Sequence, residues 1–257
     1  MNVEREPLPT HVRDTVPLPS AYDAALRAGL SAAGLVLPPE AREAIDGHLR
    51  LLLAWTQAIN LTAIRDPETA ATAHVLDSLS AIALLRDRGI ERFLDLGSGG
   101  GLPGIPLAAA LPATEAMLVE PVGKKARFLL TVIAATGLDA SVRVAATRAE
   151  TLARDPRHRS RWPAITVRAV ARAAELVELT FPLLAPSGIL VAWKRGDIED
   201  ERRSAVVAAQ ALGGGRIEVV DVDLPGLRGH RLLVATRTGV VPDAYPRDPG
   251  IRKRRPW

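Results

Sequence analysis

The sequence contains no cysteine among its 257 residues. Disulfides, thiol nucleophiles, iron–sulfur clusters and cysteine-ligated zinc sites are therefore excluded. The remaining residues form no recognisable metal-binding pattern, and we expect no metal site. The absence of cysteine does not fix the compartment, but a reducing cytosol fits it, and the cytoplasm is our expectation.

The chain also lacks a long hydrophobic run. No apolar run reaches about 18 residues, the shortest candidate length for a transmembrane helix, so we expect no membrane contact. The first 20 residues carry charges and four prolines where a signal peptide needs an apolar stretch. We therefore expect residues 1–20 to form a disordered extension.

A large excess of one charge is missing as well. The net charge is only +4, because 33 basic residues offset 29 acidic ones. Such a balance does not by itself indicate nucleic-acid binding, for which the distribution of charge matters more. The segment from Arg247 to Arg255 has five basic residues in nine, and we expect residues 239–257 to form a basic tail.

The hydrophobic period changes near residue 90. Helical spacing of apolar residues predicts helices over residues 21–34, 38–59 and 67–85, which form a helical N-terminal cap over residues 21–88. From residue 89 to 238, strands alternate with helices. This alternation predicts an α/β domain with a mostly parallel, seven-stranded, Rossmann-like sheet and helices on both faces. Strands are expected at residues 92–96, 115–121, 140–147, 164–170, 188–194, 216–224 and 231–238, the last two as an antiparallel pair.

Five glycines lie between the first strand and the next helix, in FLDLGSGGGLPGIPLAAALP. Such a turn lets backbone N–H groups approach a ligand closely. Dinucleotide sites use the pattern G-x-G-x-x-G, which is present here as Gly99, Gly101 and Gly104. S-adenosylmethionine (SAM) sites place an acidic residue two positions before the first glycine, here Asp95 before Gly97, Gly99 and Gly101.

Two features favour SAM over a dinucleotide. The Asp95 carboxylate can engage the cationic methionine portion of SAM, whereas it would repel a pyrophosphate. Pro103 and Pro106 remove backbone N–H groups that a pyrophosphate would need. Glu120 at the end of the second strand can accept both ribose hydroxyls, but this feature fits NAD equally well. The remaining alternative is a tight turn that binds no ligand.

Loops after the third and fourth strands complete the expected pocket, because ligands of open α/β sheets lie at the carboxyl ends of the strands. Ala149 and Glu150 follow the third strand and are placed to flank an adenine, although Glu150 can equally be an exposed acid at a helix start. Arg168 ends the apolar fourth strand, and an arginine at such a position has a functional role more often than it is a chance surface residue.

The sequence resembles a known family through several segments in a fixed order. These are "NLTAIRDP", "HVLDSL", "FLDLGSGGGLPGIPLA", "KKARFL", "VRAVA" and "YPRDPG", over about residues 45–255, and they are similar to the RsmG (GidB) family of bacterial 16S rRNA guanine-N7 methyltransferases. The resemblance implies an enzyme that transfers a methyl group from SAM to one guanine of 16S rRNA, free or within the small ribosomal subunit. It implies cofactor contacts at Gly97, Leu102, Glu120, Pro121, Val122, Ala149, Glu150 and Arg168.

The chain departs from the family pattern at three places. Glu120 replaces the usual aspartate, Trp162 and Pro163 replace an aromatic–aspartate pair, and Arg195 is inserted before Gly196. The last two departures affect the expected mouth of the substrate site rather than the cofactor.

The reaction that the resemblance implies needs no general base, because N7 of guanine has a free lone pair and no proton to lose. The enzyme must hold N7 in line with the methyl carbon and exclude water. We therefore expect no catalytic acid or base. The Asn-Pro-Pro-Tyr motif of amine methylation and the cysteine nucleophile of carbon methylation are both absent.

Candidate RNA contacts lie on the cap and on basic segments of the chain. On the cap, Asn60 precedes a helix on which three residues share one polar face by their spacing: His74, Asp77 and Ser78. Basic residues open the helix after the second strand against its dipole, which phosphate binding would explain: Lys124, Lys125 and Arg127. Lys194 ends the fifth strand, and the tail places four basic residues near Trp257: Arg252, Lys253, Arg254 and Arg255. For each group the alternative is an ordinary solvated surface.

Three other functions remain open from the residues alone. A SAM-dependent methyltransferase of a small molecule or protein would keep the fold, but aromatic residues for a lid are scarce at 4%. An NAD-dependent oxidoreductase would use Gly99, Gly101 and Gly104. A catalytically silent RNA-binding protein could share the fold. The sequence does not give the oligomeric state, and a monomer is the expectation.

Overall fold

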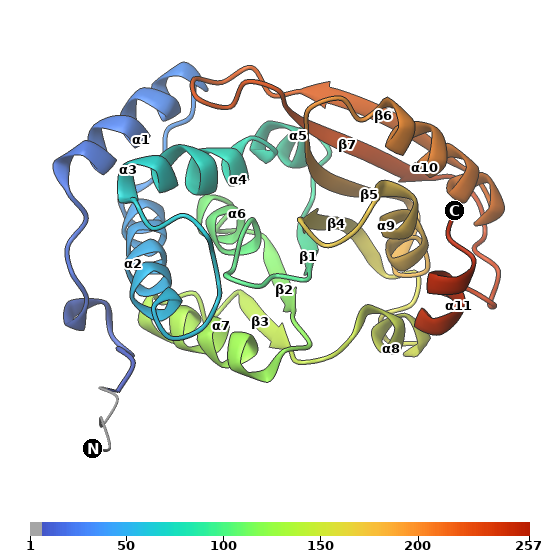
Figure 1. Cartoon of the computed structure of the whole chain (residues 1–257), viewed down its shortest axis with the longest axis horizontal. Coiled ribbons are helices and arrows are strands. Elements are labelled where there is room, and N and C mark those ends of the chain that lie inside the picture. The colour runs from blue at the N-terminus through green and yellow to red at the C-terminus, as the bar shows by residue number, and fades with distance from the viewer. Residues whose placement is uncertain (1–6) are drawn as a thin grey trace.

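A computed structural model describes residues 7–257, and in these residues a seven-stranded sheet forms the centre of the molecule (Figure 1). The strand order is β3-β2-β1-β4-β5-β7-β6. The pairs among β1 to β5 are parallel, and β7 is antiparallel to both β5 and β6. The predicted Rossmann-like sheet with its antiparallel closing pair is confirmed. The bounds are β1 Arg92–Leu96, β2 Glu115–Val119, β3 Val142–Ala145, β4 Trp162–Arg168, β5 Leu184–Arg195, β6 Gly215–Asp221 and β7 His230–Arg237.

Helices cover both faces of the sheet, which explains why the parallel strands are apolar on both sides. Successive residues of β1 point to opposite cores: Phe93 packs with α2, α6 and α7, whereas Leu94 packs with α8, α9 and α10. Within the described chain, none of the helices is long and apolar enough to cross a membrane. The first helices are η1 Val12–Asp14, α1 Ser20–Ala32 and α2 Pro39–Thr56. The later ones are α6 Gly104–Ala110, α7 Gly123–Ala135, α8 Ala149–Arg154, α9 Ala173–Thr180, α10 Glu199–Ala211 and α11 Pro249–Arg254.

The helix predicted over residues 67–85 is interrupted by a turn at residues 80–81, and the middle of its first part is π-helical. Its segments are α3 Pro67–Ala70, the π-helix η2 Ala71–Leu76, α4 Asp77–Leu79 and α5 Ile82–Asp87. Within η2, the carbonyl of Ala73 accepts a hydrogen bond from Arg168 at 3.2 Å. This partner comes from β4, so the helical period of the segment alone could not reveal it.

The N-terminal segment differs from the expected disordered extension. Residues 1–6 lie outside the described residues, but the following segment packs against the cap through Leu8, Val12 and Leu18. The indole N–H of Trp55 donates to the carbonyl of Pro9 at 2.8 Å. Arg50 also donates to the carbonyl of Thr15 at 2.6 Å. The prolines thus set an extended path along α2, and the prediction of disorder is wrong for this part.

The C-terminal segment is likewise more than a basic tail. It forms α11 and folds back beside α8 and α9 (Figure 1). The guanidinium of Arg247 holds the buried carboxylate of Glu178 through N–O distances of 2.6 and 2.9 Å. Although burial acts to raise the pKa of Glu178, the hydrogen bonds from Arg247 lower it overall. The pair therefore anchors this segment to α9 in its ionised form.

Candidate functional site

The glycine loop connects β1 to α6 with a backbone that favours glycine. Gly97, Gly99 and Gly101 have φ angles of 73°, 53° and 82°, in the left-handed region. The N–H groups of Gly97 and Ser98 both donate to the carbonyl of Val119, at 2.8 and 3.1 Å. These bonds tie the loop to the carboxyl end of β2, where the predicted ligand site lies.

The glycines of this loop face different surroundings. A Cβ added at Gly97 would lie 2.5 Å from Val170, at Gly101 2.5 Å from Ile105, and at Gly104 2.5 Å from Leu118. A Cβ at Gly99 would meet no heavy atom nearer than 3.8 Å. Gly104 therefore serves packing against the sheet, whereas Gly99 borders open space that a ligand can enter.

Glu120 joins the glycine loop to the start of α7. Its carboxylate accepts the N–H of Gly99 at 2.9 Å and the N–H of Val122 at 2.8 Å, one on each oxygen. The side chain is buried, so these two bonds hold it in one orientation. Each oxygen keeps a further lone pair, so the carboxylate can accept hydroxyl groups of a ligand as well.

Asp95 lies beneath the loop rather than facing a ligand. Its side chain is 1% exposed, and Oδ1 accepts the hydroxyl of Thr166 at 2.7 Å. Oδ2 has no hydrogen-bond partner among the described residues. Burial raises the pKa of Asp95 from 3.8 to about 6. The expectation of direct contact with a cationic ligand therefore does not fit this placement, because Asp95 supports the loop from below.

A cavity of about 230 Å³ opens at the carboxyl ends of β1 to β3. It brings together four of the predicted cofactor residues: Gly97, Pro121, Ala149 and Glu150. Leu102 is buried in the turn that leads into α6, and Val122 is exposed just before α7. Neither of these two residues lines the cavity.

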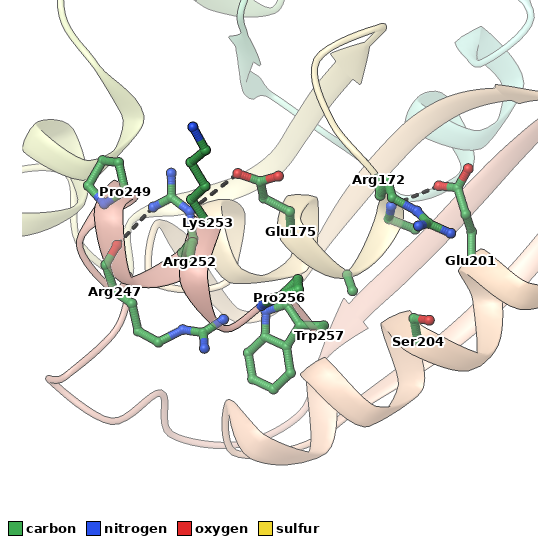
Figure 2. Close-up of a pocket in the computed structure, with 12 residues that line it drawn as sticks. Arg172, Glu175, Glu201, Ser204, Arg247, Pro249, Arg252, Lys253, Pro256 and Trp257 are labelled. Atoms are coloured by element: carbon green, nitrogen blue, oxygen red, sulfur yellow. Dashed lines mark hydrogen bonds and ion pairs between the residues drawn. The ribbon is translucent and has the colours of Figure 1, made fainter.

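The wall of this cavity contains an ion pair that sequence reasoning missed. Arg252 of α11 reaches Glu150 at an N–O distance of 2.5 Å, and both side chains are buried. The same guanidinium lies 3.3 Å from the carboxylate of Glu175 on α9 (Figure 2). Arg252 is therefore a buried, paired residue in the wall of this cavity rather than a free cation of a basic tail. Glu150 is correspondingly a paired, buried acid rather than an exposed one.

Arg168 also lies away from this cavity, in a buried network at the ends of β4, β5 and β7. It pairs with Asp77 at 3.0 Å, and Nδ1 of His230 lies 2.9 Å from the other oxygen of the same carboxylate. The indole of Trp193 donates to the backbone carbonyl of Asp77 at 2.7 Å. Asp77 therefore joins the cap to three strands of the sheet through its carboxylate and its backbone carbonyl.

His74 and Ser78 are buried in the same region. Nε2 of His74 lies 2.6 Å from the Thr62 hydroxyl, and Ser78 donates its hydroxyl to the carbonyl of His74 at 2.6 Å. Burial, with the nearby charge of Arg168, lowers the pKa of His74 to about 4. The polar face predicted to contact RNA is therefore buried in the protein, where its histidine and aspartate bond to Thr62, Arg168 and His230.

Lys194 differs from its predicted role in the same way. Its ammonium group lies 2.6 Å from the Glu201 carboxylate and 3.0 Å from the carbonyl of Ala171. Only 11% of its side chain is exposed, so no free charge remains for a phosphate. Six candidate RNA contacts are exposed: Asn60, Lys124, Arg127, Lys253, Arg254 and Arg255, while Lys125 is half-buried.

His48 is a further residue that sequence reasoning missed. Its Nε2 lies 2.7 Å from the carbonyl of Gly100, at the centre of the glycine loop. Burial lowers its pKa to about 4, so the ring is neutral near pH 7. Because a carbonyl oxygen can only accept, Nε2 bears the ring proton and donates it to Gly100. Nothing in the pattern of α2 distinguishes this histidine from an ordinary core residue.

Comparisons with known proteins identify the family of this chain. A family model described as rRNA small subunit methyltransferase G (GidB) matches residues 41–224. Ribosomal RNA small subunit methyltransferase G of Dehalococcoides mccartyi is 39% identical over 89% of this chain and 97% of its own. The protein of the same name from Roseiflexus castenholzii is 40% identical over 87% of this chain and 94% of its own.

A solved structure supports the fold independently. It is a methyltransferase from Geobacter sulfurreducens with a TM-score of 0.53, at 15% identity, and the match covers 82% of this chain and 97% of that chain. The resemblance predicted from the ordered segments is confirmed by the family match and by the relatives. The chain belongs to the GidB family, rRNA small subunit methyltransferase G.

Proposed function

We propose that this chain transfers the methyl group of SAM to N7 of one guanine in the 16S rRNA of the small ribosomal subunit. The observation that carries the cofactor assignment is the cradle at Gly99, where an open approach to the backbone lies beside the fixed carboxylate of Glu120. The names of the relatives support rRNA of the small subunit as the substrate. Such a substrate would place the protein in the cytoplasm.

The residues around the cavity fit SAM by their chemistry. Glu120 is held beside Gly99 of the glycine loop and has lone pairs for the two ribose hydroxyls, while Ala149 lines the cavity, where it can contact the adenine. Gly97 and Pro121 present backbone without a bulky side chain at the cavity edge. SAM, when bound, supplies an electrophilic methyl carbon.

The role of the chain in this reaction is to bind, orient and exclude water. N7 of guanine attacks with its own lone pair, so no side chain has to remove a proton. Positioning two reactants in line can lower the barrier by several kcal/mol, on the order of 7–11 at the upper limit. Asp95, Glu120 and His48 serve this aim by holding the glycine loop in one conformation.

The exposed basic residues provide the surface that faces RNA in this proposal. Lys124 and Arg127 lie on α7, which begins at Gly123 beside the cavity residues Pro121 and Val119. Lys253, Arg254 and Arg255 lie on or next to α11, whose buried side carries Arg252. Cations on two elements beside one cavity suit an RNA strand that crosses its mouth.

The test compares substrates directly. Purified protein and labelled SAM are incubated with small ribosomal subunits that lack the modification, with large subunits, and with total cellular protein. We expect label in the RNA of small subunits only. Label in large subunits or protein, with none in small subunits, would overturn the proposed substrate while leaving the cofactor assignment intact.

A further inference from the structure

A second and larger cavity lies beside the cofactor cavity. Its volume is about 420 Å³, within the range of small-molecule sites. It is enclosed by the start of α9, by one side of α10 and by the C-terminal segment (Figure 2). The residues that matter for its chemistry are Arg172, Glu175, Glu201, Ser204, Lys253 and Trp257.

The wall formed by the C-terminal segment is fixed by internal contacts. The indole N–H of Trp257 donates to the Glu178 carboxylate at 2.7 Å, and the Arg247 guanidinium lies 4.6 Å from the centre of the Trp257 ring. The carbonyl of Arg247 accepts a hydrogen bond from Arg252 at 2.8 Å. The cavity is thus bordered by an aromatic side chain that is already held in place, which lowers the entropic cost of binding.

The charges that remain unpaired in this cavity are positive. Its two carboxylates are occupied: Glu201 contacts Lys194 at 2.6 Å, and Glu175 lies 3.3 Å from Arg252. Arg172 and Lys253 are exposed, and neither side chain has an ion pair or hydrogen bond within residues 7–257. A cavity with two free cations and an ordered indole is suited to a phosphate group attached to a flat base.

The position of the cavity links it to the reaction. Arg252 and Glu175 line both this cavity and the cofactor cavity, so the two are neighbours that share a wall. We propose that the larger cavity binds a nucleotide of the RNA strand next to the methylated guanine. Arg172 and Lys253 attract its phosphates, and Trp257 contacts its base. This inference rests on the proposed function and assigns one subsite of its substrate.

The experiment reverses the two free charges one at a time. Lys253→Glu and Arg172→Glu are compared with Arg161→Glu, which changes an exposed arginine just before β4, at the opposite end of this central strand from Arg168. We expect each cavity variant to raise KM for small subunits about tenfold. Each should also reduce the slope of log affinity against log salt concentration by about one. The control should do neither. The Kd for SAM should stay within about twofold in all three proteins, as calorimetry measures it.

Because Arg172→Glu places a carboxylate near Glu201, Arg172→Gln is measured in parallel and should show a smaller change in the same direction. Binding of a single-stranded hexaribonucleotide is followed by tryptophan fluorescence, with Trp257→Phe to assign the signal. A change in the wild type that is lost in Trp257→Phe supports the subsite. KM values equal to that of Arg161→Glu, or an oligonucleotide signal unaffected by Trp257→Phe, would overturn it.

Failure of the proposed function is distinguishable from failure of this subsite. In the first case the wild type transfers no methyl group to small subunits, yet the oligonucleotide signal still reports on the cavity. In the second case the wild type transfers normally and the charge reversals behave like the control. A loss of SAM affinity in Lys253→Glu would also contradict the subsite, since it would assign Lys253 to the cofactor.

Discussion

Single residues of the glycine loop have separate roles that the spacing of the motif does not reveal. Gly97, Gly101 and Gly104 leave room for protein atoms, whereas Gly99 leaves room for a ligand. Asp95 and His48 lie under or beside the loop and hold it through buried contacts. A substitution at Gly99 should therefore affect ligand binding more than folding.

We predict that Gly99→Val weakens SAM binding by roughly 100-fold or more, about 2.7 kcal/mol. The new side chain would occupy the space through which the cofactor approaches the backbone. Gly34→Val is a matched control, since Gly34 has a φ of 62° with no atom within 4 Å of an added Cβ and lies between α1 and α2. Calorimetry with SAM on both variants measures the effect. Equal affinities in the two variants would contradict the role given to Gly99.

A second prediction concerns Asp95 and pH. Because burial raises its pKa from 3.8 to about 6, the folded protein binds this proton more tightly than the unfolded chain does. The free energy of unfolding should therefore fall by about 3 kcal/mol as pH rises from about 4 to about 6, and this contribution should stay constant above that range. Urea unfolding of the wild type and Asp95→Asn tests this, because the variant cannot titrate there. Parallel profiles for the two proteins would contradict it.

At the scale of elements, the strands were predictable and the broken helix was not. Strands buried on both faces appear as short apolar runs, so β1 and β4 could be located from the sequence alone. The π-helix η2 accepts a hydrogen bond from Arg168, which is far from η2 in the chain. Glu150 and Glu178 hold α11 and the residues before it through ion pairs, and both are far from α11 in the chain. Local spacing contains no information about such partners. Local spacing therefore could not show that the polar face of His74, Asp77 and Ser78 is buried, and this face was interpreted as exposed.

Helix α11 connects the C-terminal segment to the cofactor cavity, and Arg252 makes that connection. We predict that Arg252→Gln lowers the free energy of unfolding by about 3 kcal/mol, since it leaves the buried Glu150 without its partner. SAM affinity should fall about tenfold, because Glu150 lines the cavity. Arg254→Gln, on the exposed side of the same helix, is the control.

A double-mutant cycle separates the pair from the rest of the helix. Arg252→Gln combined with Glu150→Gln should regain part of the stability lost in the single variant, because no buried charge is then unpaired. Additive losses in the double variant, or an Arg252→Gln protein as stable as Arg254→Gln, would show that the ion pair does not hold α11 in place.

At the scale of the whole molecule, the cap and the C-terminal segment both close on the carboxyl ends of the strands. The cap reaches the glycine loop through His48, and α11 reaches the cofactor cavity through Arg252. The order of the elements and the glycine loop were sufficient to predict the fold and the cofactor class. The division of basic residues into buried partners and exposed contacts was not predictable, because it depends on which carboxylates fold against them.

In the proposed function, this arrangement of the whole molecule methylates N7 of one guanine in small-subunit rRNA. The most direct measurement is nucleoside analysis of the 16S rRNA after reaction of unmodified small subunits with SAM, using Gly99→Val as the inactive control. We predict a single 7-methylguanosine per 16S rRNA with the wild-type protein and none with the variant. A methyl group on another atom or another nucleoside, formed by the wild type and lost in Gly99→Val, would contradict the chemistry proposed for this site.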